Sequence, residues 1–122
     1  MRKVMVLTAL LLTAVSCGDD DTEPTPNPTD ATITITATGV NPPSVTINAG
    51  GRINWVNNDT VAHHPSSDPH PSHTDCPGLG PSSALNPGQS ATSVALTTRR
   101  TCGFHDHLND TNASLRGSVI IQ

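Results

Sequence analysis

The chain has 122 residues, a formal net charge of −4 at pH 7 and only 2% aromatic residues. This length allows one modest domain, and the acidic charge lacks the basic patch that nucleic-acid binding needs, so we expect no nucleic-acid partner. The core must consist of Val, Ile, Leu and Ala, which alternate with Thr in several segments, and this composition favours an all-β fold.

The N-terminus has the pattern of an export signal. Residues 1–16 combine a basic start, an apolar stretch and small residues before a cleavage point, which is typical of a secretory signal peptide. The apolar stretch is shorter than the about 20 residues of a transmembrane helix. The sequence Ala14-Val15-Ser16-Cys17 resembles the bacterial lipobox, so we expect lipidation at Cys17 and a location in the cell envelope or periplasm. The alternative is an ordinary signal peptide that contains a cysteine.

Residues 17–30 are expected to form a tether. The segment after Cys17 is rich in Asp, Thr and Pro and has no apolar side chain to bury, so it stays extended. Its acidic run is a solvated spacer rather than a cation site. The lipid would therefore be the protein's one attachment to a membrane.

Residues 31–122 are expected to form one domain made of strands. Alternating apolar and Thr residues predict a half-buried strand from Ala31 to Thr38. Two further strands, at 45–47 and 53–56, flank a glycine turn and are expected to follow one another across it. Residues 59–88 are rich in Pro and Gly and lack apolar periodicity, so we expect one long loop there.

The remaining strands are expected in the C-terminal third. Alternation predicts a strand over residues 90–98, and a further short strand is expected to end near Cys102. The compact apolar run at 115–122 suits a closing strand. No segment has a helical pattern of apolar residues.

The residues that suit a metal gather in one region. All six histidines lie between positions 63 and 107, together with two of the three cysteines. Imidazole and thiolate together suit copper or zinc. In the densest segment, Cys102 and His105 lie three residues apart, followed by His107. On a tight loop the first two can bind one ion if another ligand, for which His63 is the candidate, comes from elsewhere.

The order of these segments resembles a known family. The segment 45–59, then His63, residues 85–90, the pair Cys102 and His105 and finally residues 116–121 are similar to the plastocyanin and azurin family of blue copper proteins, the cupredoxins. The resemblance covers essentially all of residues 31–122. It implies a cupredoxin-like Greek-key β-sandwich that binds copper, acts as a monomeric one-electron carrier and meets a redox partner protein.

The resemblance also implies a ligand set. Two histidines and one cysteine form the trigonal copper site of that family, with a weak axial ligand that is often methionine. Carried over, the equatorial ligands are His63, Cys102 and His105. The axial position falls on Leu108 or on Leu115, and because leucine cannot bind a metal, such a site would be three-coordinate.

Cys76 offers a competing role for Cys102. In an oxidising compartment the two cysteines that are not lipidated tend to pair, and a Cys76–Cys102 disulfide would remove the thiolate. Copper would then depend on imidazole alone, with His63, His105 and His107 as the expected set. We expect His107 to reach the same ion as His105 only where the chain bends into a loop.

The middle loop contains a second group of candidate ligands. His70, His73 and Cys76 follow one another at three-residue intervals, and zinc accepts such a mixture. The alternative, which we favour, is a surface loop whose histidines bond its own backbone, because Pro69 and Pro71 hold the segment extended.

Three functions are compatible with this sequence. The first is a copper electron carrier, which requires Cys102 as a free thiolate. The second is a copper storage or delivery protein of the envelope, with histidine ligands and a disulfide. The third is a structural or interaction module without metal. No serine–histidine–acid order and no pair of carboxylates flanking a pocket stands out, so we expect no enzyme activity.

Overall fold

The structure is a computed structural model, and it describes residue 18 and residues 28–122. The expected signal peptide at 1–16, the lipidation site Cys17 and tether residues 19–27 lie outside the described residues, so the boundaries at 16 and 30 stay predictions. Within the described part of the chain, no helix is long and apolar enough to cross a membrane.

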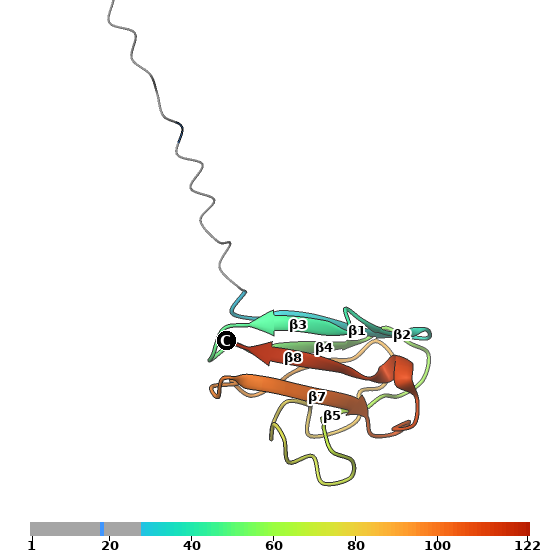
Figure 1. Ribbon diagram of the computed structural model, residues 1–122. Coiled ribbons are helices and arrows are strands. Elements are labelled where there is room, and N and C mark those ends of the chain that lie inside the picture. Colours follow the sequence, from blue (N-terminus) through green and yellow to red (C-terminus); the bar gives the residue numbers. More distant parts are fainter. Residues whose placement is uncertain (1–17, 19–27) are drawn as a thin grey trace, which may run out of the picture.

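Two four-stranded sheets form the domain (Figure 1). The first contains β1 (Ala31–Thr36), β2 (Gly39–Asn41), β4 (Ile53–Asn57) and β6 (Ser90–Thr92), in the order β2-β1-β4-β6. The second contains β3 (Ser44–Ile47), β5 (Pro65–Ser67), β7 (Arg100–Asp106) and β8 (Gly117–Ile121), in the order β3-β8-β7-β5. A short 3-10 helix, η1 (Ala113–Leu115), precedes β8. The all-β sandwich expected from the sequence is confirmed.

Each sheet mixes parallel and antiparallel neighbours. In the first sheet, β1 is parallel to β4 and antiparallel to β2, while β4 and β6 are antiparallel. In the second, β3 is parallel to β8, and β7 is antiparallel to both β8 and β5. The register places Ser66 of β5 opposite His105 of β7, which brings the loops at both ends of β5 close to the candidate ligands.

The core lies between the two sheets and follows the period-two pattern of the strands. Ile33 and Ile35 of β1 are buried, as the alternation predicts. The two aromatic residues meet here, since the rings of Trp55 and Phe104 lie edge to face with centroids 4.9 Å apart. The indole Nε1 of Trp55 donates to the carbonyl of Leu79 at 2.8 Å, which ties the long middle loop to the core.

Several element boundaries differ from the expectation. The strands at 45–47 and 53–56 do follow one another, but they lie in opposite sheets and do not pair. The strand expected over 90–98 ends at Thr92. Ser93 stops the ladder there, because its side-chain Oγ accepts the hydrogen bond of the Ile53 amide at 2.8 Å. The middle loop contains β5, a strand that the sequence pattern did not indicate.

Candidate metal centre

Strand β7 determines where the expected ligands point. The sequence predicted that the strand ends near Cys102, but it continues to Asp106. Side chains three residues apart on a strand point to opposite faces. Cys102 therefore points into the core with Phe104, and His105 points to the other face, so the expectation that Cys102 and His105 bind one ion on a tight loop is wrong.

Cys102 is bonded to another cysteine in this structure. Its sulfur forms a disulfide with Cys76, which lies 26 residues away in the chain, and the two Cα atoms are 5.9 Å apart. Both residues are buried. A sulfur in a disulfide offers no thiolate, so the alternative with paired cysteines describes the structure and the trigonal site with Cys102 as a ligand does not.

Both ring nitrogens of His63 contact carboxylates. Its Nδ1 lies 2.8 Å from Asp106 Oδ2 and its Nε2 lies 2.9 Å from Asp59 Oδ2. Burial by itself lowers the pKa of His63, but the hydrogen bonds with Asp106 and Asp59 outweigh it and raise the pKa above its ordinary value of 6.5. An imidazolium with both N–H groups donated has no lone pair for a metal, so His63 does not act as the expected remote ligand.

Four other histidines come together instead. One ligand atom from each of them lies within 4.8 Å of the other three. We call this group the four-histidine cluster; its members are His70, His73, His105 and His107. His105 is fully buried, His73 and His107 are half-buried and His70 is exposed. The cluster therefore has one closed side, on the sheet, and one side that faces solvent.

His105 is the best oriented member of the cluster. Its Nδ1 lies 2.7 Å from Asp68 Oδ1, and because a carboxylate only accepts, Nδ1 carries the proton. In the neutral ring Nε2 then has a free lone pair. Among the described residues, this Nε2 is the one buried side-chain nitrogen or oxygen without a hydrogen-bond partner. A carboxylate behind one ring nitrogen and an unsatisfied lone pair at the other is the arrangement of a metal-binding histidine.

His73 and His107 face each other across the cluster. Nδ1 of His73 donates to the carbonyl of Ser67 at 2.9 Å, which leaves its Nε2 as an acceptor. That Nε2 lies 2.9 Å from Nδ1 of His107, so one proton lies in the hydrogen bond between these two nitrogens. An ion bound by both nitrogens would take the place of that proton.

His107 lies on the same side of the chain as His105. It follows β7 by one residue, and positions two apart in a strand share a face. The expectation that a bent loop is needed to bring the two together is therefore wrong. Burial, followed by the charges of the neighbouring histidines with His73 first, holds the pKa of His107 below its ordinary value of 6.5, which favours the neutral form that binds metals.

The positions expected to be axial play no part in the cluster. Leu108 is 55% exposed, whereas Leu115 is buried at the end of η1. His64, next to His63, donates through Nε2 to the carbonyl of Pro81 at 3.1 Å. Asp106, which lies between His105 and His107 in the chain, contacts the ring of His63 and no member of the cluster.

A cavity of about 330 Å³ adjoins the cluster. His73, His107 and His64 line it, together with Cys76 and several Ser and Gly residues of the middle loop. The walls are mostly polar, so water and small solutes can reach the imidazoles from this side.

Sequence reasoning named His70 and His73 as candidate ligands with Cys76 but favoured a surface loop, and it did not place them with His105 and His107. The loop that contains them was interpreted as extended, but it folds back: the amide of His73 donates to the carbonyl of Pro69, and that of Asp75 to the carbonyl of Asp68. One signal was available, because a disulfide at Cys76 brings the residues just before it to β7. The expected second site with Cys76 as a ligand is not formed, because its sulfur is bonded to Cys102.

The donor set fits copper or zinc. Imidazole nitrogen suits both ions, and with metal–nitrogen bonds of about 2 Å the ligand atoms of one site lie up to about 4 Å apart. The four ligand atoms lie within 4.8 Å of one another, so a small rotation of one imidazole would bring them to the spacing of a single site. His70 can rotate in this way, because its side chain is exposed and is not packed in the core. Nε2 of His105 is buried and has no hydrogen-bond partner that would compete with an ion.

The fold is that of the cupredoxins. A purple cupredoxin from Nitrosopumilus maritimus superposes with a TM-score of 0.59 at 21% identity, over 76% of this chain and 100% of that one. Auracyanin from Roseiflexus castenholzii gives 0.58 at 14% identity, over 79% and 98% of the two chains. Amicyanin from Paracoccus versutus gives 0.59 at 16% identity, over 80% and 92%.

At these identities the likeness concerns the fold. No protein-family model matches the sequence, and no curated protein matches it. The cupredoxin-like sandwich expected from the sequence is thus confirmed by structure, while the ligands follow from the residues of this chain alone.

Proposed function

We propose that this chain is an exported copper-binding protein that holds its ion with the four-histidine cluster and stores or delivers it at the cell envelope. The observation that carries the proposal is the buried Nε2 of His105, which has no hydrogen-bond partner and belongs to a residue whose ligand atom lies within 4.8 Å of those of three further imidazoles. Solved structures of similar fold include amicyanin in a Cu(I) form, which supports copper as the ion.

Storage or delivery agrees better with this site than electron transfer does. A blue copper centre depends on a cysteine thiolate, and Cys102 is in a disulfide. The cluster is open to solvent at His70 and borders a polar cavity, so ligands of a partner protein can approach the ion and exchange with it. The proposal contains no catalytic step.

The proposed location rests on the N-terminal sequence. A lipid on Cys17 would attach the protein to a membrane surface, with the tether as the spacer. The domain would act there as a monomer and pass copper to, or take it from, another protein of the envelope.

Titration with Cu(II) tests the proposal. We expect the purified protein carrying Cys17→Ser, which removes the lipidation thiol, to bind one Cu(II) with the weak absorption of nitrogen ligands. His105→Ala should lower the affinity at least about tenfold. His64→Ala is the matched control, because His64 lies beside His107 but is not one of the four histidines whose ligand atoms come together; we expect it to leave the affinity unchanged.

Two results would contradict this function. An intense thiolate-to-copper band would favour the second candidate, the one-electron carrier with a redox partner, to which the cupredoxin fold of the structural neighbours points. No copper binding by the folded protein would favour a structural or interaction module without metal.

A further inference from the structure

The loop between β5 and Cys76 contributes half of the cluster. We call residues 68–76 the histidine loop, since they contain His70 and His73. Figure 1 shows this segment, in yellow-green, projecting beyond the β5 side of the second sheet. The other two histidines belong to β7 and the residue after it. The cluster therefore exists only where the histidine loop is held against β7.

A disulfide holds one end of this loop. The other end continues from β5, which is paired with β7, whereas Cys76 is bonded directly to Cys102 of β7. Among the described residues, the core includes Cys76 but no residue of 68–75. The cystine thus joins the C-terminal end of the loop directly to β7, while the buried Leu79, three residues further on, packs in the core between the sheets.

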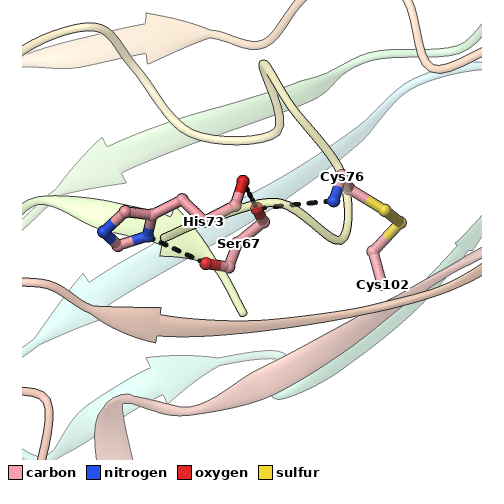
Figure 2. The surroundings of a disulfide bond; sticks show 4 residues. All are labelled: Ser67, His73, Cys76 and Cys102. Carbon is pink, nitrogen blue, oxygen red and sulfur yellow. Dashed lines mark hydrogen bonds between the residues drawn. A yellow bond between two sulfur atoms is a disulfide. The ribbon is translucent and has the colours of Figure 1, made fainter. Parts of the chain in front are cut away.

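Ser67 couples the disulfide to His73 (Figure 2). Its Oγ donates to the carbonyl of His73 at 2.8 Å and accepts from the amide of Cys76 at 3.4 Å. Its own carbonyl accepts from Nδ1 of the His73 ring at 2.9 Å. One serine therefore contacts both the half-cystine and the imidazole, so a displacement of Cys76 changes the position of His73.

The two cysteines differ in accessibility. Cys102 is fully buried, while Cys76 retains 6% exposure and lines two cavities, one of which adjoins the cluster. A thiolate that enters a cavity therefore meets Cys76 before Cys102. Thiol–disulfide exchange requires access to one sulfur only.

We infer that the Cys76–Cys102 disulfide positions the histidine loop and makes metal affinity depend on the thiol redox state, an inference that rests on the proposed function. A thiolate of an external dithiol attacks Sγ of Cys76, the S–S bond breaks, and Cys102 leaves as a thiolate and takes up a proton. The second thiol of the reductant then resolves the mixed disulfide. The dithiol loses two electrons, both cysteines become thiols, and the loop is released from β7.

The first experiment measures Cu(II) affinity without the disulfide. In the full chain carrying Cys17→Ser, the double variant Cys76→Ala/Cys102→Ala should bind Cu(II) about 10- to 100-fold more weakly than its parent. Fluorescence of the buried Trp55 reports whether the sandwich is folded. Ile35→Val, a core change in the opposite sheet, is the control for general loosening, and its affinity should equal that of the parent.

The second experiment measures access to the disulfide. Dithiothreitol added to the folded protein should yield two thiols per chain while the Trp55 signal is unchanged. Reduction that occurs only in denaturant would overturn the redox dependence.

The outcomes separate the two ideas. Equal Cu(II) affinity in the double variant and its parent, or an equal loss in Ile35→Val, would overturn the positioning role and leave the proposed function standing. A parent that binds no Cu(II), or whose binding survives His105→Ala, would remove the proposed function itself.

Discussion

The protonation of single histidines decides which of them can bind a metal. His63 and His105 are both buried and both contact a carboxylate. His63 has a carboxylate at each ring nitrogen, which stabilises the imidazolium, whereas His105 has one at Nδ1 only and its Nε2 has no partner. The same residue type is thus paired at both ring nitrogens in one place and at only one in the other.

The pair of carboxylates around His63 predicts a pH dependence of stability. Hydrogen bonds with Asp106 and Asp59 raise the pKa of His63 above 6.5, so its contribution is complete below that pH and is lost as the pH rises through the folded-state pKa. The hydrogen bond from His63 lowers the pKa of Asp59 from 3.8; that contribution is complete above pH 3.8 and is lost as the pH falls through the lower value.

The variant His63→Gln tests this dependence. The difference in the free energy of unfolding between parent and variant should be largest between about pH 4 and about pH 6.5 and should shrink at higher pH. Urea denaturation at a series of pH values measures it. His64→Gln is the matched control, because His64 donates to a backbone carbonyl. A difference for His63→Gln that stays constant across the series would contradict the assignment.

The course of β7 determines the site at the scale of whole elements. The sequence predicted the strands near 31–36, 53–57 and 117–121: the first from apolar alternation, the second from the glycine turn before it and the third from a compact apolar run. It did not predict the end of β7, because the pattern from Cys102 to Asp106 contains glycine, histidine and aspartate, which strands rarely favour. Because the strand continues for four residues after Cys102, the side chain of His105 points to the opposite face from that of Cys102.

The histidine loop could not be predicted from local sequence. Its position depends on a disulfide to a distant strand and on turns in which His73 and Asp75 bond residues of the same loop. Such contacts leave no periodic signal. The candidate ligands near β7 were therefore found in part, as His105 and His107, while the two from the loop were assigned to the surface.

Gly103 of β7 allows the loop and the strand to approach. A Cβ at this position would clash with the side-chain carboxylate of Asp68, the partner of His105. The end of a side chain can move without unfolding the sheet, so we expect Gly103→Ala to remain folded but to displace Asp68. The copper affinity of Gly103→Ala should fall about 10- to 100-fold. We expect the same loss in Asp68→Asn, which weakens the same contact with His105.

Calorimetric titration with Cu(II) measures this effect, with Thr101→Ala, an exposed position of the same strand, as the control. The double variant Gly103→Ala/Asp68→Asn should lose little more copper affinity than either single variant, because both substitutions act through His105. Additive losses would show that Gly103 acts in another way.

At the scale of the whole molecule, the disulfide supports a sandwich with a small core. The described chain has two large aromatic side chains in its core, Trp55 and Phe104, and domains of about this size are marginally stable, at about 5–15 kcal/mol. The cystine joins Cys102, in the middle of the second sheet, to the long middle loop. It therefore limits the freedom of the largest irregular segment of the fold.

Reduction should consequently lower stability as well as metal affinity. A cross-link between residues 26 apart contributes roughly 3 to 4 kcal/mol in the loop-entropy description, so dithiothreitol should lower the midpoint of thermal unfolding by more than about 10 °C. Circular dichroism measures this shift, and the variant Cys76→Ala/Cys102→Ala, already without the bond, should not respond to the reductant. An unchanged midpoint in the parent would contradict a stabilising role. Because the expected loss is smaller than the typical stability of such domains, the sandwich without the disulfide should stay folded at ambient temperature, so a lower copper affinity of Cys76→Ala/Cys102→Ala, measured without reductant, would report the release of the histidine loop rather than unfolding.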